Sequence, residues 1–328
     1  MKKLVFTLAT CCIMCACEQK TETNPFFTEF RTEYGAPDFD KIKIEHYEPA
    51  FLKGIEEQNA EIKAIVESRE TPGFENTIVA LDNSGRTLAR VKGVFYALTE
   101  ADTNDEMSAL SEKIAPVLSE HNDNIYLNQD LYKRVAAVWQ QEQEGKITLT
   151  TEQHRLLDRY YKAFIRSGAG LDAGKQNRLR EINKELSTLA ITFSNHILNE
   201  NNAYRLVIDN EAELAGLPEW VKTGAAEEAK AVGKEGKWLF TLQNSSRLPL
   251  LQYADNRELR KDIYEAYINR GNNGDANDNK EILKKIISLR LEKANLLGFD
   301  CYSNFVLDNT MAKNSTTVML SLIHISEP

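Results

Sequence analysis

The spacing of the apolar residues is the feature that most limits the folds open to this chain. Over most of its length they recur at steps of three, four or seven residues, which places them on one face of a helix. Three such stripes are Tyr47, Phe51, Ile55, Ile62 and Ile65; Leu179, Ile182, Leu186, Leu189, Phe193 and Ile197; and Ile282, Ile286, Leu289 and Leu296. Two capping-box pairs, Thr150 with Gln153 and Asp255 with Glu258, mark helix starts. The sequence therefore predicts a mainly α fold.

Two short segments interrupt the helical pattern. Ala203 to Asp209 and Lys237 to Gln243 concentrate β-forming residues in runs of strand length. The stretch between them has Pro218 at a favourable first helical position and several alanines, which predicts a helix joining two strands. We therefore expect one small β element in which the two strands pair.

The first residues have the pattern of a bacterial lipoprotein signal. Lys2 and Lys3 precede an apolar run from Leu4 to Met14, which is too short to cross a membrane. The run is followed by Cys15, Ala16 and Cys17, and a small residue directly before a cysteine resembles the cleavage box of lipoproteins, where the cysteine is lipidated. We expect a signal peptide at 1–16, an acylated Cys17 that binds the lipid bilayer, and a polar tether at 17–25. The alternatives are ordinary secretion with cleavage nearby, or a metal cluster formed by the cysteines of CCIMCAC.

The composition indicates a globular body. Of 328 residues, 42% are hydrophobic and 27% charged, which is enough for a substantial core. The formal net charge of −9 argues against nucleic acid as a partner. Once the signal is removed only Cys17 and Cys301 remain, so we expect no internal disulfide. The expected location is the cell envelope of a bacterium, in the periplasm or at the outer membrane.

A search for catalytic patterns finds none that is complete. The zinc motif H-E-x-x-H, in which two histidines one helical turn apart ligate the metal, is absent. The histidines are widely separated: His46, His121, His154, His196 and His324. His196 and Glu200 could share one helix face, and we expect them to be a solvated or capping pair and not metal ligands. His46 is expected at the start of a helix. No G-x-S-x-G or phosphate-binding glycine loop is present, and the surroundings of Cys301 indicate a buried, unreactive thiol.

Several separated strings resemble one family of enzymes. They are EHYEPAFLKGIEEQNAEIKAI, FENTIVALDNSGRTLARVKGVF, AGLPEWV, NRELRKDIYEAYINRG and LRLEKANLLGFDCYSNFVLDNTMA. In this order they resemble the N-terminal half of the thimet oligopeptidase, oligopeptidase A and peptidyl-dipeptidase family of zinc metallopeptidases. The resemblance runs from about Ile42 to Met319.

The resemblance implies a mainly helical, two-lobed enzyme with a deep channel between the lobes, which cuts short unstructured peptides. Family members bind one zinc ion through H-E-x-x-H and a downstream glutamate, and the glutamate inside the motif is the general base. These residues belong to the family's C-terminal half, so the resemblance places no catalytic residue and no zinc ligand in this chain. Residues 26–319 would then be the incomplete N-terminal lobe of a peptidase that is a monomer at full length, and the fragment alone would be inactive.

The last residues depart from the family pattern. Leu320 to Pro328 read LSLIHISEP, and a DNA string that encodes them resembles a transposase adapter used in sequencing libraries. We therefore expect 320–328 to be a translated adapter and the natural protein to continue past Met319, so His324 is left out of every argument about ligands. The alternative is a natural short paralogue with its own ending. If a lobe is missing, apolar faces on helices such as Ile282 to Leu297 should be exposed.

Three hypotheses of function follow. The first is the N-terminal fragment of an exported zinc peptidase, with release of C-terminal dipeptides preferred, by analogy alone, to internal cleavage. The second is a lipid-anchored, non-catalytic helical protein that binds peptides, and the third is a structural lipoprotein. An H-E-x-x-H motif downstream of Met319 would favour the first, and an early stop codon the second. Zinc-dependent cleavage of peptides would count against the third.

Overall fold

The protein is mainly helical and carries one two-stranded sheet, as the apolar spacing predicts. The computed structural model describes residues 24–326. The signal peptide at 1–16, Cys17 and most of the tether at 17–25 lie outside the described residues, as do the last two residues of the 320–328 segment. None of the described helices is long and apolar enough to cross a membrane.

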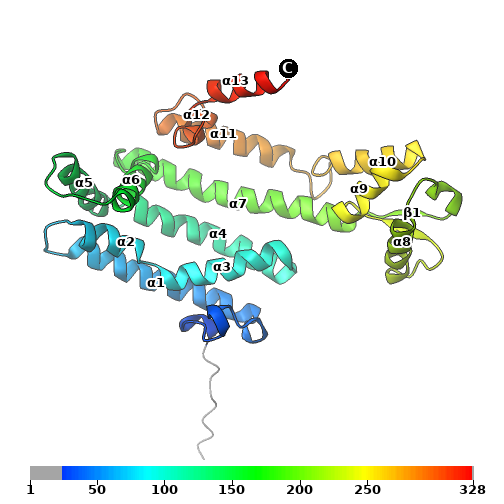
Figure 1. Ribbon diagram of the computed structural model, residues 1–328, viewed down its shortest axis with the longest axis horizontal. Coiled ribbons are helices and arrows are strands. Elements are labelled where there is room, and N and C mark those ends of the chain that lie inside the picture. The colour runs from blue at the N-terminus through cyan, green and yellow to red at the C-terminus, as the bar shows by residue number, and fades with distance from the viewer. Residues whose placement is uncertain (1–23, 327–328) are drawn as a thin grey trace, which may run out of the picture.

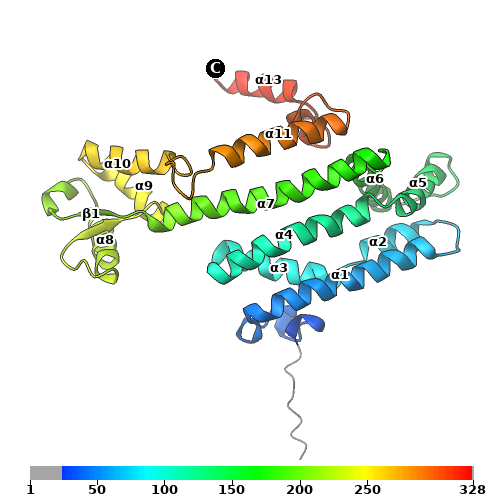
Figure 2. The same cartoon turned by 180° about the vertical axis from the view of Figure 1, so that it is seen from behind.

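The body of the molecule is a stack of long helices (Figures 1 and 2). In chain order they are α1 (Ile44–Glu67), α3 (Arg86–Ala101), α4 (Asp105–Tyr126), α7 (Ala173–Ala203) and α11 (Lys280–Leu296). α1 packs on α3 and α4, α4 packs on α7, and α7 packs on α11. At 1.5 Å per residue α7 is about 46 Å long, so it reaches from one end of the stack to the other.

A second group of helices closes one end of the stack. They are α2 (Ala80–Asp82), α5 (Gln129–Gln143) and α6 (Thr151–Arg166), together with a π-helical turn, η4 (Phe74–Val79). The predicted capping box starts α6, because the Thr150 hydroxyl accepts from the Gln153 backbone N–H and the Gln153 side chain accepts from that of Thr150. This prediction is confirmed.

The small β element lies at the opposite end of α7 (Figure 1). Strand β1 (Leu206–Ile208) pairs antiparallel with β2 (Trp238–Phe240), and the predicted connecting helix is α8 (Glu219–Ala231). Two further helices follow, α9 (Asn244–Tyr253) and α10 (Arg257–Ile268). The cap predicted for α10 at Asp255 is wrong by one residue, because the Asn256 side chain accepts from the Glu258 backbone N–H instead.

Apart from one 3₁₀ turn in the middle of the chain, the remaining elements lie near the two ends of the described residues. The 3₁₀ turns are η1 (Pro25–Phe27), η2 (Glu33–Gly35), η3 (Phe39–Lys41) and η5 (Glu211–Leu214), of which η5 precedes α8. At the other end lie α12 (Tyr302–Leu307) and α13 (Ser315–Ser326). α13 includes most of the 320–328 segment, but a helical backbone does not test where that segment comes from. The adapter origin stays a prediction.

The core is divided among three buried clusters in the described part of the chain. The first joins α1 and α3 around Phe51 and Phe95, the second lies under α5 and α6, and the third holds the sheet against α8 and α9. The middle of α7 differs, because Leu186 and Phe193 of its predicted stripe are only half-buried. The flanks of α7 are therefore where the helices pack least completely.

An apolar face of α11 is exposed, as the sequence predicts. Ile286 and Leu289 are buried, whereas Leu283, Ile287 and Leu291 are 47%, 58% and 46% exposed. These three residues repeat every four positions, so they form one stripe along the helix. Exposed apolar stripes of this kind promote association.

Replacing Ile287 by lysine should reduce self-association of the chain, because it puts a charge in the middle of that stripe. We expect the weight-average mass from sedimentation velocity, and the binding of a hydrophobic dye, to fall relative to the unchanged chain. Val232→Lys is the matched control, since Val232 is 46% exposed but lies outside the stripe. A chain that is already monomeric and does not bind the dye would contradict the prediction.

Candidate functional site

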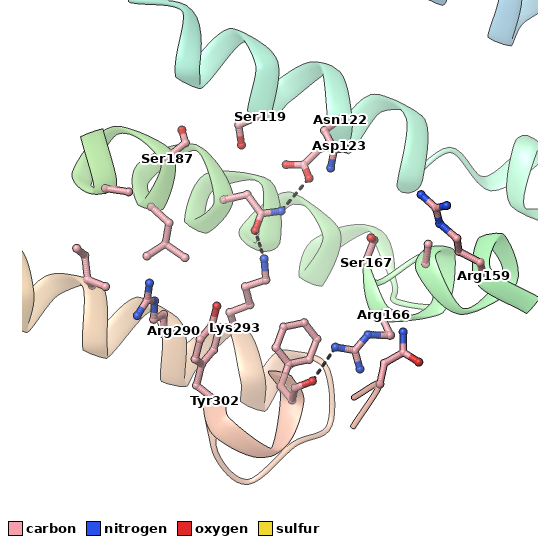
Figure 3. Close-up of a pocket in the computed structure, with 17 residues that line it drawn as sticks. Ser119, Asn122, Asp123, Arg159, Arg166, Ser167, Ser187, Arg290, Lys293 and Tyr302 are labelled. Carbon is pink, nitrogen blue, oxygen red and sulfur yellow. Dashed lines mark hydrogen bonds between the residues drawn. The ribbon is translucent and has the colours of Figure 1, made fainter. Parts of the chain in front are cut away.

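A pocket of about 630 Å³ lies where the stacked helices α4, α7 and α11 meet α6 and α12 (Figure 3). Its residues come from α4, α6, α7, α11 and α12, and we call it the basic pocket. Figure 3 shows α4 and α7 on one side of it and α11 and α12 on the other. The pocket therefore lies on the incompletely packed flank of α7.

Cationic side chains dominate the basic pocket. Arg159 and Arg166 come from α6, and Arg290 and Lys293 come from α11. Among the described residues that line the pocket, Asp123 of α4 is the one carboxylate. Figure 3 places Arg159 and Arg290 on opposite sides, with Lys293 between them. The pocket is thus locally positive in a chain whose formal net charge is −9.

Arg166 binds α12 and the residue that follows it. Its Nη1 donates to Asp308 Oδ2 at 2.7 Å, and its Nη2 donates to the backbone carbonyl of Phe305 at 2.7 Å. The guanidinium carbon also lies 4.7 Å from the centroid of the Phe305 ring. These contacts fix α12 against the end of α6, and Asp308 balances the charge of Arg166.

Lys293 and Asp123 are joined through an amide. Lys293 Nζ donates to Asn183 Oδ1 at 2.6 Å, and Asn183 Nδ2 donates to Asp123 Oδ1 at 2.8 Å. Burial lowers the pKa of Lys293, with the charge of Asp123 opposing that shift. Burial also raises the pKa of Asp123, against the hydrogen bond from Asn183 and the charges of Arg180 and Lys293. The three side chains tie α4, α7 and α11 together.

Replacing Asp123 by asparagine should change how the stability of the protein depends on pH. The folded-state pKa of Asp123 is raised above its ordinary value of 3.8, so the folded state binds more protons than the unfolded state just above that pH. The stabilisation is complete below pH 3.8 and is lost as the pH rises through the folded-state pKa. The free energy of unfolding of the unchanged chain minus that of Asp123→Asn should therefore fall over this window.

Urea unfolding between about pH 3.5 and pH 7 measures this difference directly. Asp130→Asn, which removes an exposed carboxylate from α5, is the control for a general change of charge. A difference between the unchanged chain and Asp123→Asn that stays flat, or that rises with pH, would show that burial does not govern this carboxyl group.

A second pocket, of about 440 Å³, lies beside the sheet. Its lining includes Trp220 and Gly224 of α8, Arg205 and Gln243. Trp220 is 62% exposed, and a Cβ placed on Gly224 would meet nothing within 4 Å, so this side of α8 is open. An exposed indole beside amide and guanidinium groups provides both stacking and hydrogen bonding to a polar ligand.

The histidines have structural partners. His46 Nδ1 accepts from the Lys43 backbone N–H at the start of α1, as its position predicts. His121 Nε2 lies 2.7 Å from Gln58 Oε1, and His154 Nδ1 lies 2.6 Å from Glu142 Oε1. Within residues 24–326, no three His, Cys, Asp or Glu side chains are grouped so that they could hold a metal ion.

His196 and Glu200 share α7 but do not act as a pair. His196 Nδ1 lies 2.9 Å from Asn279 Oδ1, whereas buried Glu200 accepts from the Gly271 backbone N–H at 2.9 Å and from Asn273. Both side chains hold the turn before α11 against α7. The prediction of a solvated or capping pair is therefore wrong, because each side chain has its own partner.

The predictions made for Cys17 and Cys301 have different outcomes. Cys17, the predicted lipidation site, lies outside the described residues, so that assignment stays a prediction. Cys301 is half-exposed, and its Sγ lies 3.2 Å from Ser303 Oγ. The prediction that it is buried is wrong, because it occupies the extended N-cap position of α12 and not the interior of a helix.

The basic pocket was not predicted, although the sequence contains a weak signal for it. Arg159 and Arg166 are seven residues apart on α6, and Arg290 and Lys293 are three apart on α11, so each pair shares one face of its helix. Nothing in the local sequence indicates that α6 and α11 approach each other. Only the packing of both helices beside α7 brings the four side chains together.

Comparison with known proteins defines the family. Residues 250–328 match the sequence profile of peptidase family M3. The chain is 38% identical over 293 residues to the dipeptidyl carboxypeptidase of Escherichia coli strain K12, which covers 89% of this chain and 43% of that protein. It is 33% identical over 301 residues to the oligopeptidase A of Salmonella typhimurium, covering 90% and 43%, and 28% identical over 252 residues to the saccharolysin of Saccharomyces cerevisiae, covering 76% and 34%.

The chain belongs to peptidase family M3, in agreement with the resemblance found in its sequence. It spans less than half the length of the curated relatives named above.

Proposed function

We propose that this chain is the N-terminal part of a zinc metallopeptidase that hydrolyses short unstructured peptides. The observation that carries the proposal is the 38% identity to a dipeptidyl carboxypeptidase over 293 residues of this chain. The identity to an oligopeptidase A is lower, at 33%, which supports release of dipeptides over internal cleavage. The two-lobed architecture with a channel, and a single-chain monomer at full length, are part of the same proposal.

The described residues do not fit the zinc ion of such an enzyme. No three potential ligands are grouped in residues 24–326, and each described histidine considered above, from His46 to His196, is held by a non-metal partner. We therefore assign no chemical step to these residues and propose that the ligands lie beyond Met319. The part played by this chain is to bind and orient peptides and to provide much of the helical scaffold.

The test begins with the source gene, read across the codon for Met319 with long reads that carry no adapter. The complete product is then incubated with N-acetyl-tetraalanine, and the products are identified by mass spectrometry. We expect Ala-Ala to be released, the activity to be lost with a chelator and restored by zinc, and no hydrolysis by the 328-residue chain. A stop codon after Pro328 together with peptide binding but no hydrolysis would favour the non-catalytic binder.

We also propose that the protein is anchored in the bacterial cell envelope through an acylated Cys17. The support is the apolar run from Leu4 to Met14, which follows two lysines and precedes the Ala16-Cys17 pair. Cells grown with labelled palmitate should label the unchanged chain and Cys15→Ser, whereas Cys17→Ser should lose both the label and its place in the membrane fraction. Equal labelling of Cys17→Ser and Cys15→Ser would reject the anchor.

A further inference from the structure

The charges that line the basic pocket do not all find a partner. Asp308 balances Arg166, and Asp123 balances Lys293 through the amide of Asn183. Arg159 and Arg290 form no ion pair with any carboxylate in the described part of the chain. Arg290 lies over the ring of Tyr302, with its guanidinium carbon 5.1 Å from the centroid. Two positive charges therefore remain available to a ligand.

The position of these two charges limits the kind of ligand. Figure 3 shows Arg159 and Arg290 on opposite sides of the pocket, with Lys293 and Asp123 between them. Asn183 joins these two side chains through its hydrogen bonds. A compact oxyanion such as phosphate is held best where several donors converge on one point, and these arginines do not converge. An extended ligand with an anionic group near each end matches them better.

The rest of the lining suits a peptide. Ser119, Ser187 and Asn122 offer neutral donors and acceptors for amide groups, while Leu186 and Ile286 offer apolar surface. A volume of about 630 Å³ falls within the range of about 300–1,000 Å³ for ligand pockets, and it can hold a short peptide segment.

We propose that the basic pocket is a binding site for short peptides that carry two acidic side chains, one bound by Arg159 and the other by Arg290. This inference rests on the proposed function, because that function makes peptides the ligands of the protein. It adds a preference for acidic peptides and the two residues that determine it. In this proposal the basic pocket positions or selects peptides.

Binding of two blocked peptides to the full chain tests the proposal. The peptides are N-acetyl-Glu-Ala-Ala-Glu-amide and N-acetyl-Gln-Ala-Ala-Gln-amide, whose blocked ends leave side-chain charge as their only difference. Isothermal titration calorimetry at low salt should give a dissociation constant at least about tenfold lower for the acidic peptide, which corresponds to about 1.4 kcal/mol. The preference should shrink at about 0.5 M NaCl, because salt screens exposed charges.

The double variant Arg159→Gln/Arg290→Gln should remove the preference. Both side chains are exposed, so the fold should survive, and circular dichroism and thermal melting verify this. The matched control is Lys234→Gln/Arg257→Gln, which removes the same charge from exposed positions near the sheet end of the molecule and should keep the preference.

Three results would overturn the proposal. The first is equal affinity of the chain for the two peptides. The second is a preference for the acidic peptide that persists in Arg159→Gln/Arg290→Gln. The third is that inorganic phosphate or citrate displaces the acidic peptide and binds with the same affinity as that peptide. Hydrolysis by the complete gene product together with equal affinities would overturn this inference and leave the proposed function in place. An acidic preference without hydrolysis by that product would overturn the proposed catalysis and leave the binding site in place.

Discussion

Replacing Phe95 by alanine should lower the free energy of unfolding by about 4 kcal/mol, as expected for removal of a large side chain from a well-packed core. Phe95 of α3 is fully buried, and its ring lies 5.1 Å from that of Tyr47 and 5.3 Å from that of Phe51, both on α1. These rings hold the first two long helices together, so the truncation removes apolar burial, ring contacts and support for the pair. Urea unfolding followed by circular dichroism measures the loss as a lower midpoint at an unchanged slope.

Phe27→Ala is the matched control for this prediction. Phe27 belongs to the η1 turn, which packs against the same helices, but it is 38% exposed, and Lys53 Nζ lies 4.5 Å from its ring centroid. We expect a loss below about 1 kcal/mol at this position. A loss at Phe95 no greater than the loss at Phe27 would mean that the aromatic cluster is not the core of this end of the protein.

The fold could be predicted from the sequence where the neighbours of a helix all lie against one of its faces. The stripe from Tyr47 to Ile65 became the buried face of α1, because that helix has α3 and α4 on one side. The stripe on α7 was a poorer guide, since Leu179 and Ile182 are buried but Leu186 and Phe193 are half-buried. A helix that packs between α4 and α11 has two partial interfaces, and a single apolar stripe does not distinguish that arrangement from one complete interface.

The sequence did not predict the candidate site. It offered no H-E-x-x-H motif, and the search for catalytic patterns did not lead to the basic pocket. The basic pocket was missed because its arginines are distant in the sequence. The hydrogen bonds that join Lys293 to Asp123 also depend on the orientation of the Asn183 amide between them. Exposed arginines on two helices look like ordinary solvated residues until the tertiary packing puts them on either side of one cavity.

The contact between α1 and α3 should tolerate little added volume. Gly54→Val should lower the free energy of unfolding by about 3 kcal/mol, the upper part of the range for overpacked sites. A Cβ at Gly54 would lie 2.8 Å from the backbone N and Cα of Leu88 and 3.0 Å from its Cβ. Because these are mostly backbone atoms, no side-chain rotation can relieve the clash, and α1 or α3 has to move.

Gly93→Val separates this clash from the general effect of replacing a helical glycine. Gly93 lies on α3, one of the same two helices, but a Cβ there would meet nothing within 4 Å. Valine favours a helix slightly more than glycine does, so we expect Gly93→Val to change the free energy of unfolding by about 0.5 kcal/mol or less, towards greater stability. Urea unfolding of both variants should therefore give a large loss for Gly54→Val alone. Equal changes in the free energy of unfolding for the two variants would mean that α1 and α3 are further apart than the Gly54 contact requires. The rings of Phe51 and Phe95, which lie on the same two helices, would then also pack less closely than described.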